Sequence, residues 1–430
     1  MQLEAVTGLA RSGRYRWLIC ALLFLATVVN YMDRQILGLL APMLQADIGW
    51  TQLEYSRIVT AFTAAYAVGL LLAGRFIDTV GVRLAYTGAM LFWSIAAMLH
   101  AAVSSVAGFA VVRALLGLGE GGNFPAAIKS TAEWFPRSER ALATGLFNSG
   151  ANVGAIVAPA IIPALALALG WRMAFVLIGA LGLLWVPLWW STCRPVAQHP
   201  RVSPAERAFI LQDDDTVVEE VAPAAPSWRA VLRHRQVWAF MVGKFLTDPV
   251  WWFYLFWLPK WLAEERGIDM KGLGLPLVVI YLIATVGSIA GGWLSSRLLR
   301  RGATVNRARK TAMLVCALCV LPIVTVSGLH ELWLAVPVIG LAAAAHQGWS
   351  ANLFTTVSDQ FPRHAIATVV GLGGMAGSLG AVLFSEVIGR VLEQTGTYWA
   401  LFAIGGSAYL IALSIFHWLV PRMAPVDLAR

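Results

Sequence analysis

The chain reads WFPRSERALATGLFNSGANVGAI from Trp134 to Ile156 and QFPRHAIATVVGLGGMAGSLGAV from Gln360 to Val382. Each stretch carries a Phe-Pro-Arg triplet followed by two glycines at the same spacing, and each lies between long apolar segments. A repeat of this kind in the two halves of a chain predicts two six-helix bundles related by an axis along the membrane normal.

The composition is that of a membrane protein. Of the 430 residues, 59% are hydrophobic and 13% are charged, whereas a soluble domain is about 25% charged. Apolar stretches of about 20 residues, each long enough to cross a bilayer as a helix, recur along the whole chain. We therefore expect an all-α polytopic membrane protein with twelve transmembrane helices. The predicted spans are 16–40, 56–78, 84–104, 107–132, 141–168, 171–192, 237–262, 274–298, 310–328, 332–357, 367–391 and 397–420.

Loop charges predict the orientation and the division of the chain. The net charge is +9, but Lys and Arg cluster in short loops, which is the positive-inside pattern and not a nucleic-acid surface. We expect both termini to lie in the cytoplasm. Residues 1–192 and 237–430 should each form a six-helix bundle. Between them, 193–236 carries five prolines and the acidic run Asp213–Asp215, which predicts a cytoplasmic linker with a short helix around Pro204–Gln212.

The run RALLGLGEGGNFPAAIK places two charges inside an apolar span. Arg113 and Glu120 are seven residues apart, about two helical turns, so they share one side of a helix. A charge at the bilayer centre costs at least about 2.5–3.5 kcal/mol, so such residues usually face a protein interior or a wet cavity. A cation and a titratable acid, with Asn123 nearby, suit an anion and a proton. Glycines and Pro125 predict a loosened helix, although a structural ion pair would also explain the charges.

The segment NYMDRQ closes the first span. Asn30, Tyr31 and Arg34 lie on one side of a helix, whereas Asp33 points elsewhere. We expect Arg34 to be a lone buried cation and Asp33 to pair with Arg113 on span four. The alternative is that Asp33 and Arg34 lie at the membrane surface.

The loop GRFIDTVGVR joins spans two and three and resembles the G-x-x-x-D-x-x-G-x-[RK] loop of the major facilitator superfamily. Its small residues Gly74 and Gly81 allow close helix approach. Asp78 can face the N-terminal end of a neighbouring helix, or an arginine on that helix, and lock one conformer. Arg83 completes the motif, but Val82 stands where the superfamily often has a second basic residue.

Further polar and aromatic residues in apolar spans are candidates for a substrate cavity. Span seven reads DPVWWFYLFWLPKW, in which part of the aromatic run suits the headgroup level and part suits an apolar wall for a sugar ring. Tyr254 and Trp257, three residues apart, are the candidates for that wall, and Tyr66 is expected in the cavity because its hydroxyl needs a polar partner. Span ten carries polar side chains that could form hydrogen bonds with the hydroxyl groups of a substrate. These are His346, Gln347, Ser350 and Asn352, with Ser378, Ser385 and Glu386 of span eleven as weaker candidates.

Enzyme chemistry has no support in the sequence. Cys316 and Cys319 form a CxxC pattern, but within a membrane span we interpret them as small buried hydrophobic residues. There is no metal-ligand cluster, nucleotide loop or nucleophile triad, so we expect no metal and no cofactor.

Together these motifs resemble the anion:cation symporter family of the major facilitator superfamily, and within it the bacterial hexuronate and sugar-acid symporters. The resemblance rests on NYMDR, RALLGLGEGGNFPAAIK, EWFPRSERALATGLFNSG, WLPKW and AHQGWSANLFTTVSDQFP, which are spread over both halves. It implies the major facilitator fold, a monomer in a bacterial inner (plasma) membrane, and proton-driven import of an anionic sugar acid. By matching position it implies that Arg34 binds the substrate carboxylate, that Asp33 and Glu120 carry protons, and that Arg113 is the partner of Asp33. Tyr31 and Tyr66 resemble cavity tyrosines.

The expected substrate is a hexuronate such as glucuronate or galacturonate, and the alternative is an aldonate such as galactonate or another organic anion. A proton is needed because an outside-positive potential opposes anion entry by roughly 2.3 kcal/mol per charge per 100 mV. A metabolite or drug antiporter of the same fold would need a large apolar cavity without a substrate-directed arginine, and Arg34 and Arg113 argue against it. A sensor or scaffold should carry a sizeable soluble domain, which the sequence does not show.

Overall fold

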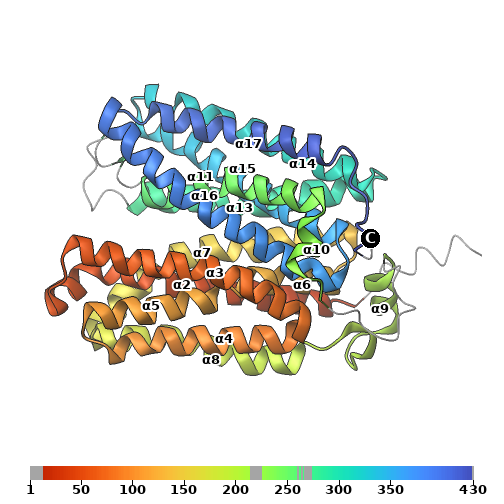
Figure 1. Cartoon of the computed structure of the whole chain (residues 1–430), viewed down its shortest axis with the longest axis horizontal. Coiled ribbons are helices and arrows are strands. Elements are labelled where there is room, and N and C mark those ends of the chain that lie inside the picture. The colour runs from red at the N-terminus through yellow and green to blue at the C-terminus, as the bar shows by residue number, and fades with distance from the viewer. Residues whose placement is uncertain (1–12, 214–224, 259–260, 263–264, 266–273, 429–430) are drawn as a thin grey trace, which may run out of the picture.

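The computed structural model describes residues 13–213, 225–258, 261–262, 265 and 274–428. Within these residues the chain is helical and has no strands, and the long helices run side by side along one direction (Figure 1). The helices are α2 (Tyr15–Ile48), α3 (Gln52–Val80), α4 (Val82–Leu99), α5 (Val106–Glu120), α6 (Asn123–Trp134), α7 (Arg137–Leu169), α8 (Trp171–Thr192), α9 (Pro204–Leu211), α10 (Trp228–Leu232), α11 (Arg235–Phe256), α13 (Gly274–Arg300), α14 (Val305–Val320), α15 (Leu332–Gln360), α16 (Ile366–Thr395) and α17 (Trp399–Leu419), with a 3₁₀ helix at Leu321–Gly328 after α14.

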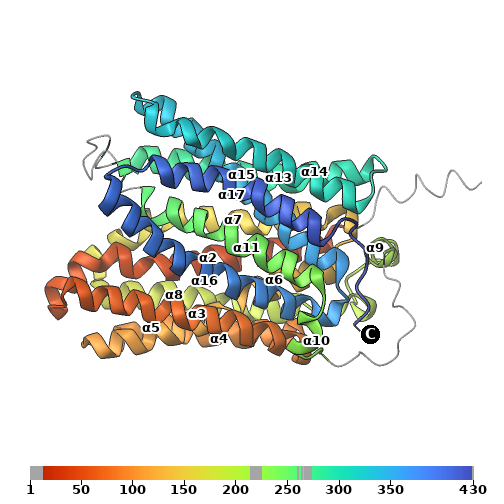
Figure 2. The ribbon, with the colours of Figure 1, turned by 45° about the horizontal axis from the view of Figure 1, so that its top comes forward.

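Helices of the first and second halves of the chain gather on opposite sides of the molecule (Figures 1 and 2). The halves meet where α7 packs against α13 and where α3 packs against α16. The two repeated stretches form the first parts of α7 and α16. In each half, the repeat therefore supplies a helix that packs against the other half. The chain therefore has the two related helical bundles that the repeat predicts.

The glycines of the repeat mark equivalent close approaches. A Cβ on Gly145 of α7 would overlap the carbonyl of Ser288 in α13, and a Cβ on Gly371 of α16 would overlap the carbonyl of Leu70 in α3. The second glycines behave in the same way toward the first helix of each half, because Gly154 lies against α2 and Gly380 lies against α11. Small residues let helix backbones approach closely, so the spacing of these glycines encodes the symmetry.

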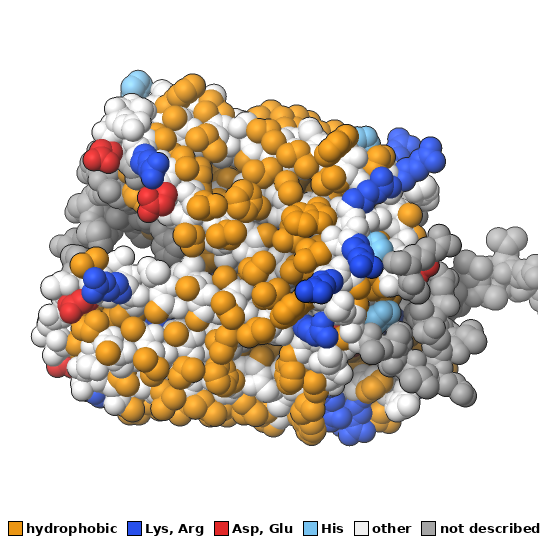
Figure 3. Space-filling model, viewed as in Figure 1, with side chains coloured by type: hydrophobic (Ala, Val, Ile, Leu, Met, Phe, Trp, Pro, Cys, Tyr) orange, Lys and Arg blue, Asp and Glu red, His pale blue; other side chains and the backbone are white. Residues whose placement is uncertain are grey.

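The surface of the molecule matches a membrane-spanning chain. Ten helices of the described residues are long and apolar enough to cross a bilayer. Hydrophobic side chains cover the middle of the face in Figure 3, and Lys and Arg gather at the end near the linker. The protein is a multi-pass membrane protein.

The fourth predicted span, 107–132, is not one continuous helix. The helix breaks at Gly121 and Gly122 between α5 and α6. A Cβ on Gly121 would overlap the backbone of α3 at Gly69, so the break allows this close approach. Pro125 lies in the first turn of α6, where its missing N–H is tolerated. The loosening predicted from these residues is therefore a full break, and it begins directly after Glu120.

The linker docks on the ends of α2 and α7. Its helix α9 starts with Pro204 after the cap Ser203, close to the predicted position. Glu206 of α9 accepts hydrogen bonds from the backbone N–H groups of Tyr15 and Arg16 and forms an ion pair with the Arg16 guanidinium at 3.0 Å. Of the predicted linker acids, Asp214 and Asp215 lie outside the described residues, as do residues 259 and 260 of the WLPKW motif.

Candidate functional site

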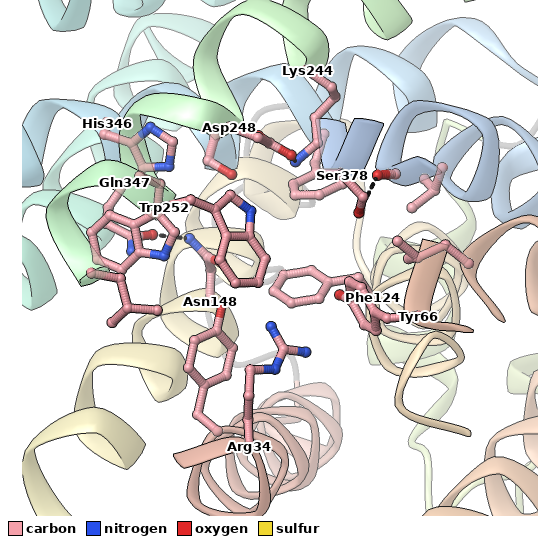
Figure 4. A pocket seen from close by; sticks show the side chains of 18 residues that line it. Arg34, Tyr66, Phe124, Asn148, Lys244, Asp248, Trp252, His346, Gln347 and Ser378 are labelled. Atoms are coloured by element: carbon pink, nitrogen blue, oxygen red, sulfur yellow. Dashed lines mark hydrogen bonds and ion pairs between the residues drawn. The ribbon is translucent and has the colours of Figure 1, made fainter. Parts of the chain in front are cut away.

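A cavity lies between the two halves, about midway along the helices, and both halves contribute its walls (Figure 4). Six residues predicted for the site line it: Tyr31, Arg34, Tyr66, His346, Gln347 and Ser350. The weaker candidate Ser378 also lines it, whereas Ser385 and Glu386 do not. The remaining lining side chains are Leu70, Phe124, Asn148, Lys244, Asp248, Trp251, Trp252, Leu255, Phe354 and Val370, with Gly374.

The cation on the first-half wall is Arg34, and its partner is Glu120. The Arg34 Nε and Nη2 atoms both donate to Glu120 Oε2, at 3.1 and 3.0 Å. Glu120 is fully buried at the end of α5, and the guanidinium also stacks on the rings of Tyr31 and Tyr66, 4.9 and 4.6 Å from their centroids. The expectation that Arg34 is a lone cation is therefore wrong. The break after Glu120 places this acid beside α2, which spacing along α5 alone does not reveal.

The expected ion pair between Asp33 and Arg113 is not formed. Instead, Arg113 donates to the backbone carbonyls of Asp33 and Arg34, at 3.4 and 3.1 Å. The Asp33 side chain is buried, and neither carboxylate oxygen has a hydrogen-bond partner among the described residues. Successive helical side chains diverge, so of the neighbours Asp33 and Arg34 only Arg34 reaches Glu120 of α5.

Four residues predicted for substrate binding do not line the cavity: Asn123, Tyr254, Trp257 and Asn352. Asn352 instead donates to the backbone carbonyls of Gly291 and Gly348. Asn123 accepts a hydrogen bond from the Tyr86 hydroxyl at 2.5 Å, which fastens the start of α6 to α4. Tyr254 lies on another face of α11 than the cavity-lining residues, and Trp257 follows the last residue of α11. The face of α11 toward the cavity carries Trp251 and Trp252, seven and eight positions after Lys244, as helical periodicity requires.

The ion pair between Lys244 and Asp248 on α11 was missed by the sequence analysis. Lys244 Nζ lies 2.7 Å from Asp248 Oδ2, and both side chains line the cavity. The available signal was a lysine and an aspartate four residues apart within an apolar span, which is the spacing of a helical ion pair.

The polar residues of α15 serve contacts within the protein as well as the cavity. His346 stacks on Trp251 with an interplanar angle of 8°, and its Nδ1 lies 2.6 Å from the Tyr409 hydroxyl. Gln347 bridges the two halves, since its Oε1 accepts from Asn148 at 2.6 Å and its Nε2 donates to Asn152 at 3.1 Å.

Asp78 of the loop motif joins the two halves at the end that carries the linker. Its carboxylate accepts hydrogen bonds from the backbone N–H groups of Thr368 (2.6 Å) and Ala367 (3.3 Å) at the start of α16. Lys129 of α6 completes the group, with its Nζ 2.9 Å from Asp78 Oδ1. Gly74 permits this contact, because a Cβ there would overlap the Ala367 carbonyl.

The other two members of the motif act within the first half. Gly81 has a φ of +88°, which lets the chain turn between α3 and α4. Arg83 donates to the carbonyl of Trp190 at 2.6 Å and lies over its ring, so it fastens α4 to α8.

A second contact closes the same end. Arg309 of α14 forms an ion pair with Asp359 of α15 at 2.7 Å and donates to the carbonyl of Arg137 in the first half at 2.9 Å. From the first half, Arg140 donates to the carbonyl of Ser358 at 2.7 Å. The sequence offered no signal for these contacts beyond loop charge, because each joins residues far apart in the chain.

Comparison with known proteins places this geometry in a family. A model of the Major Facilitator Superfamily matches residues 23–385. A hexuronate transporter of Escherichia coli (strain K12) is 30% identical over 417 residues, covering 96% of each chain. A D-galactonate transporter of Escherichia coli is 29% identical over 413 residues, covering 94% of this chain and 96% of that one. The solved structure of the proton:xylose symporter XylE superimposes with a TM-score of 0.74 at 14% identity, covering 95% of this chain and 96% of that one.

Proposed function

The chain belongs to the major facilitator superfamily, and we propose that it is a proton-coupled symporter that imports an anionic sugar acid by alternating access. A hexuronate such as glucuronate or galacturonate is the first candidate substrate, supported by the similarity to a hexuronate transporter. An aldonate is the second, supported by the similarity to a D-galactonate transporter. The membrane is the bacterial inner membrane, and both termini are cytoplasmic.

The observation that carries the proposal is the ion pair between Arg34 and Glu120 at the cavity wall. A guanidinium binds one carboxylate well in a planar, two-bond arrangement, so Glu120 and a substrate carboxylate compete for Arg34. Protonation of Glu120 removes its charge and releases Arg34 to the substrate. Proton and anion then bind together, and the pair crosses the membrane with the site electrically neutral.

The surroundings of Arg34 suit a sugar acid. Tyr31 and Tyr66 lie against the guanidinium and line the cavity, and Trp251 and Trp252 offer flat apolar surfaces for a sugar ring. Ser350 and His346 present polar groups on the opposite wall. Asp33, buried near this ion pair without a hydrogen-bond partner among the described residues, is a second place where a proton can bind.

Alternating access requires that the two ends of the cavity open in turn. The contacts of Asp78 with α16 and of Arg309 with Arg137 close the end that carries the linker. With a cytoplasmic linker, this arrangement corresponds to a transporter closed toward the cytoplasm. Rocking of one bundle against the other must break these contacts before the substrate is released inside.

The test is an uptake panel in proteoliposomes with an imposed pH gradient. Glucuronate, galacturonate, galactonate, glucose and a drug-like cation are offered separately. The proposal expects accumulation of at least one sugar acid, collapse of that accumulation by a protonophore, and no uptake of glucose or the cation. Uptake of the cation with exclusion of all the acids would favour an antiporter instead.

A further inference from the structure

The second-half wall of the cavity carries a charged pair that the scheme above does not use. Lys244 and Asp248 lie one turn apart on α11, and their charged atoms are 2.7 Å apart. The Lys244 side chain is 8% exposed and that of Asp248 is 17% exposed. Figure 4 shows the pair on the wall opposite Arg34, with Trp252 and Phe124 between them. A ligand that fills the cavity therefore meets Arg34 at one end and the pair of Lys244 and Asp248 at the other.

A structural role does not explain this pair. Buried ion pairs are weak stabilisers, because removing two charges from water offsets most of their attraction. The pairs Lys129–Asp78 and Arg309–Asp359 each tie two helices together. Lys244 and Asp248 are on the same helix, so their ion pair does not connect α11 to another helix.

The neighbouring helix leaves space for the acid. A Cβ on Gly377 of α16 would overlap the Asp248 carboxylate, so this position accommodates it without a side chain of its own. Lys244 Nζ lies 4.2 Å from the ring centroid of Phe354. An ammonium between a carboxylate and an aromatic face keeps part of its attraction when the carboxylate loses its charge.

We propose that Lys244 and Asp248 form a second, proton-gated anion site, which takes the far carboxylate of a sugar dicarboxylate (an aldarate) when Asp248 is protonated. The inference rests on the proposed function, in which Arg34 holds the first carboxylate. Lys244 is paired with Asp248 in the same way that Arg34 is paired with Glu120. In each pair, the acidic side chain binds the cation until that side chain takes up a proton.

Charge balance links the number of protons to the class of substrate. The pairs Arg34–Glu120 and Lys244–Asp248 each have a net charge of zero. A monocarboxylate keeps the cavity neutral with one proton, on Glu120, and leaves the second pair intact. A dicarboxylate keeps it neutral only with two protons, because an uncompensated buried charge is costly. The other titratable groups that face this pair from the helices around it are Tyr31, Tyr66, His346 and Tyr409.

The experiment measures the binding of galacturonate, with one carboxylate, and galactarate, with two, to the purified full-length protein from pH 8 to pH 6. The wild-type protein should take up about twice as many protons with galactarate as with galacturonate, and its affinity for galactarate should rise more steeply on acidification. The double variant Lys244→Gln/Asp248→Asn keeps the site neutral. It should weaken galactarate binding about 10- to 100-fold, the value of one charge-assisted contact, and change galacturonate binding much less.

Two further variants complete the test. Asp248→Asn leaves Lys244 without its acid, so galactarate binding should lose its extra pH dependence. Arg297→Gln removes one positive charge outside the cavity and should leave both ligands unaffected. The inference is overturned if the wild-type protein does not bind galactarate, or if the double variant weakens both ligands equally. In either case galacturonate binding that depends on Arg34 would leave the proposed function standing, whereas the loss of that dependence would remove both.

Discussion

Asp78→Asn should shift the protein away from the arrangement that is closed at the linker end. The carboxylate of Asp78 receives the N–H groups of Thr368 and Ala367, which belong to the other half, and the ammonium of Lys129, which belongs to the same half. Only the first two contacts depend on closure. Hydrogen bonds to a charged group contribute about 1.5–3 kcal/mol each, and an amide keeps one acceptor oxygen but loses the charge.

We therefore assign about 2–3 kcal/mol to the part of the contact that favours closure, which shifts the equilibrium about 30- to 150-fold toward opening. The readout is alkylation of Ser358→Cys, a buried position at this closure, after replacement of the four native cysteines. The rate should rise strongly in Asp78→Asn. Asp47→Asn is the matched control, because its pair with Arg172 is about half exposed. Equal alkylation rates with and without the Asp78 change would refute this reasoning.

Three further changes have clear expected outcomes. Gly74→Val should also open the linker end, since its side chain would overlap the backbone of α16, and normal protection of the same cysteine probe would contradict this. Arg34→Ala should abolish sugar-acid binding while thermal unfolding in detergent stays cooperative; near-native affinity would show that the carboxylate binds elsewhere. Burial lowers the pKa of His199, and its neutral ring contacts the Thr192 carbonyl and accepts a hydrogen bond from the Arg201 N–H. The contribution of His199 to stability is therefore present above pH about 6.5 and is lost as the pH falls. His199→Gln should therefore flatten the acid side of the melting-temperature profile, and an unchanged profile would exclude this group as its cause.

The fold could be predicted from the sequence because its determinants are local or periodic. Span length and apolar composition define the helices, and the glycines of the repeat, such as Gly145 and Gly371, define where the halves touch. Asp78 was predicted to face either a helix end or an arginine on that helix, because its loop motif is short. The structure shows the helix end.

The site could be predicted only in part, because its side chains form pairs between helices that are distant in the chain. Arg34 and Glu120 were both identified, but not as partners, since the break after α5 decides what Glu120 can reach. The choice between Trp252 and Trp257 depends on how α11 is rotated, and a helix that is apolar all round carries little sign of this. Lys244 could have been found from its spacing to Asp248, which is visible in the sequence.

Competition between a proton and the substrate for the ion pair of Arg34 and Glu120 is the central claim. The most direct measurement compares two activities of Glu120→Gln in the same proteoliposomes: exchange of labelled for unlabelled sugar acid, and accumulation driven by a pH gradient. Glutamine resembles the protonated acid and cannot release a proton, so exchange should persist while gradient-driven accumulation is lost. Accumulation at the wild-type level would contradict the claim and would move proton coupling to Asp33 or another acid.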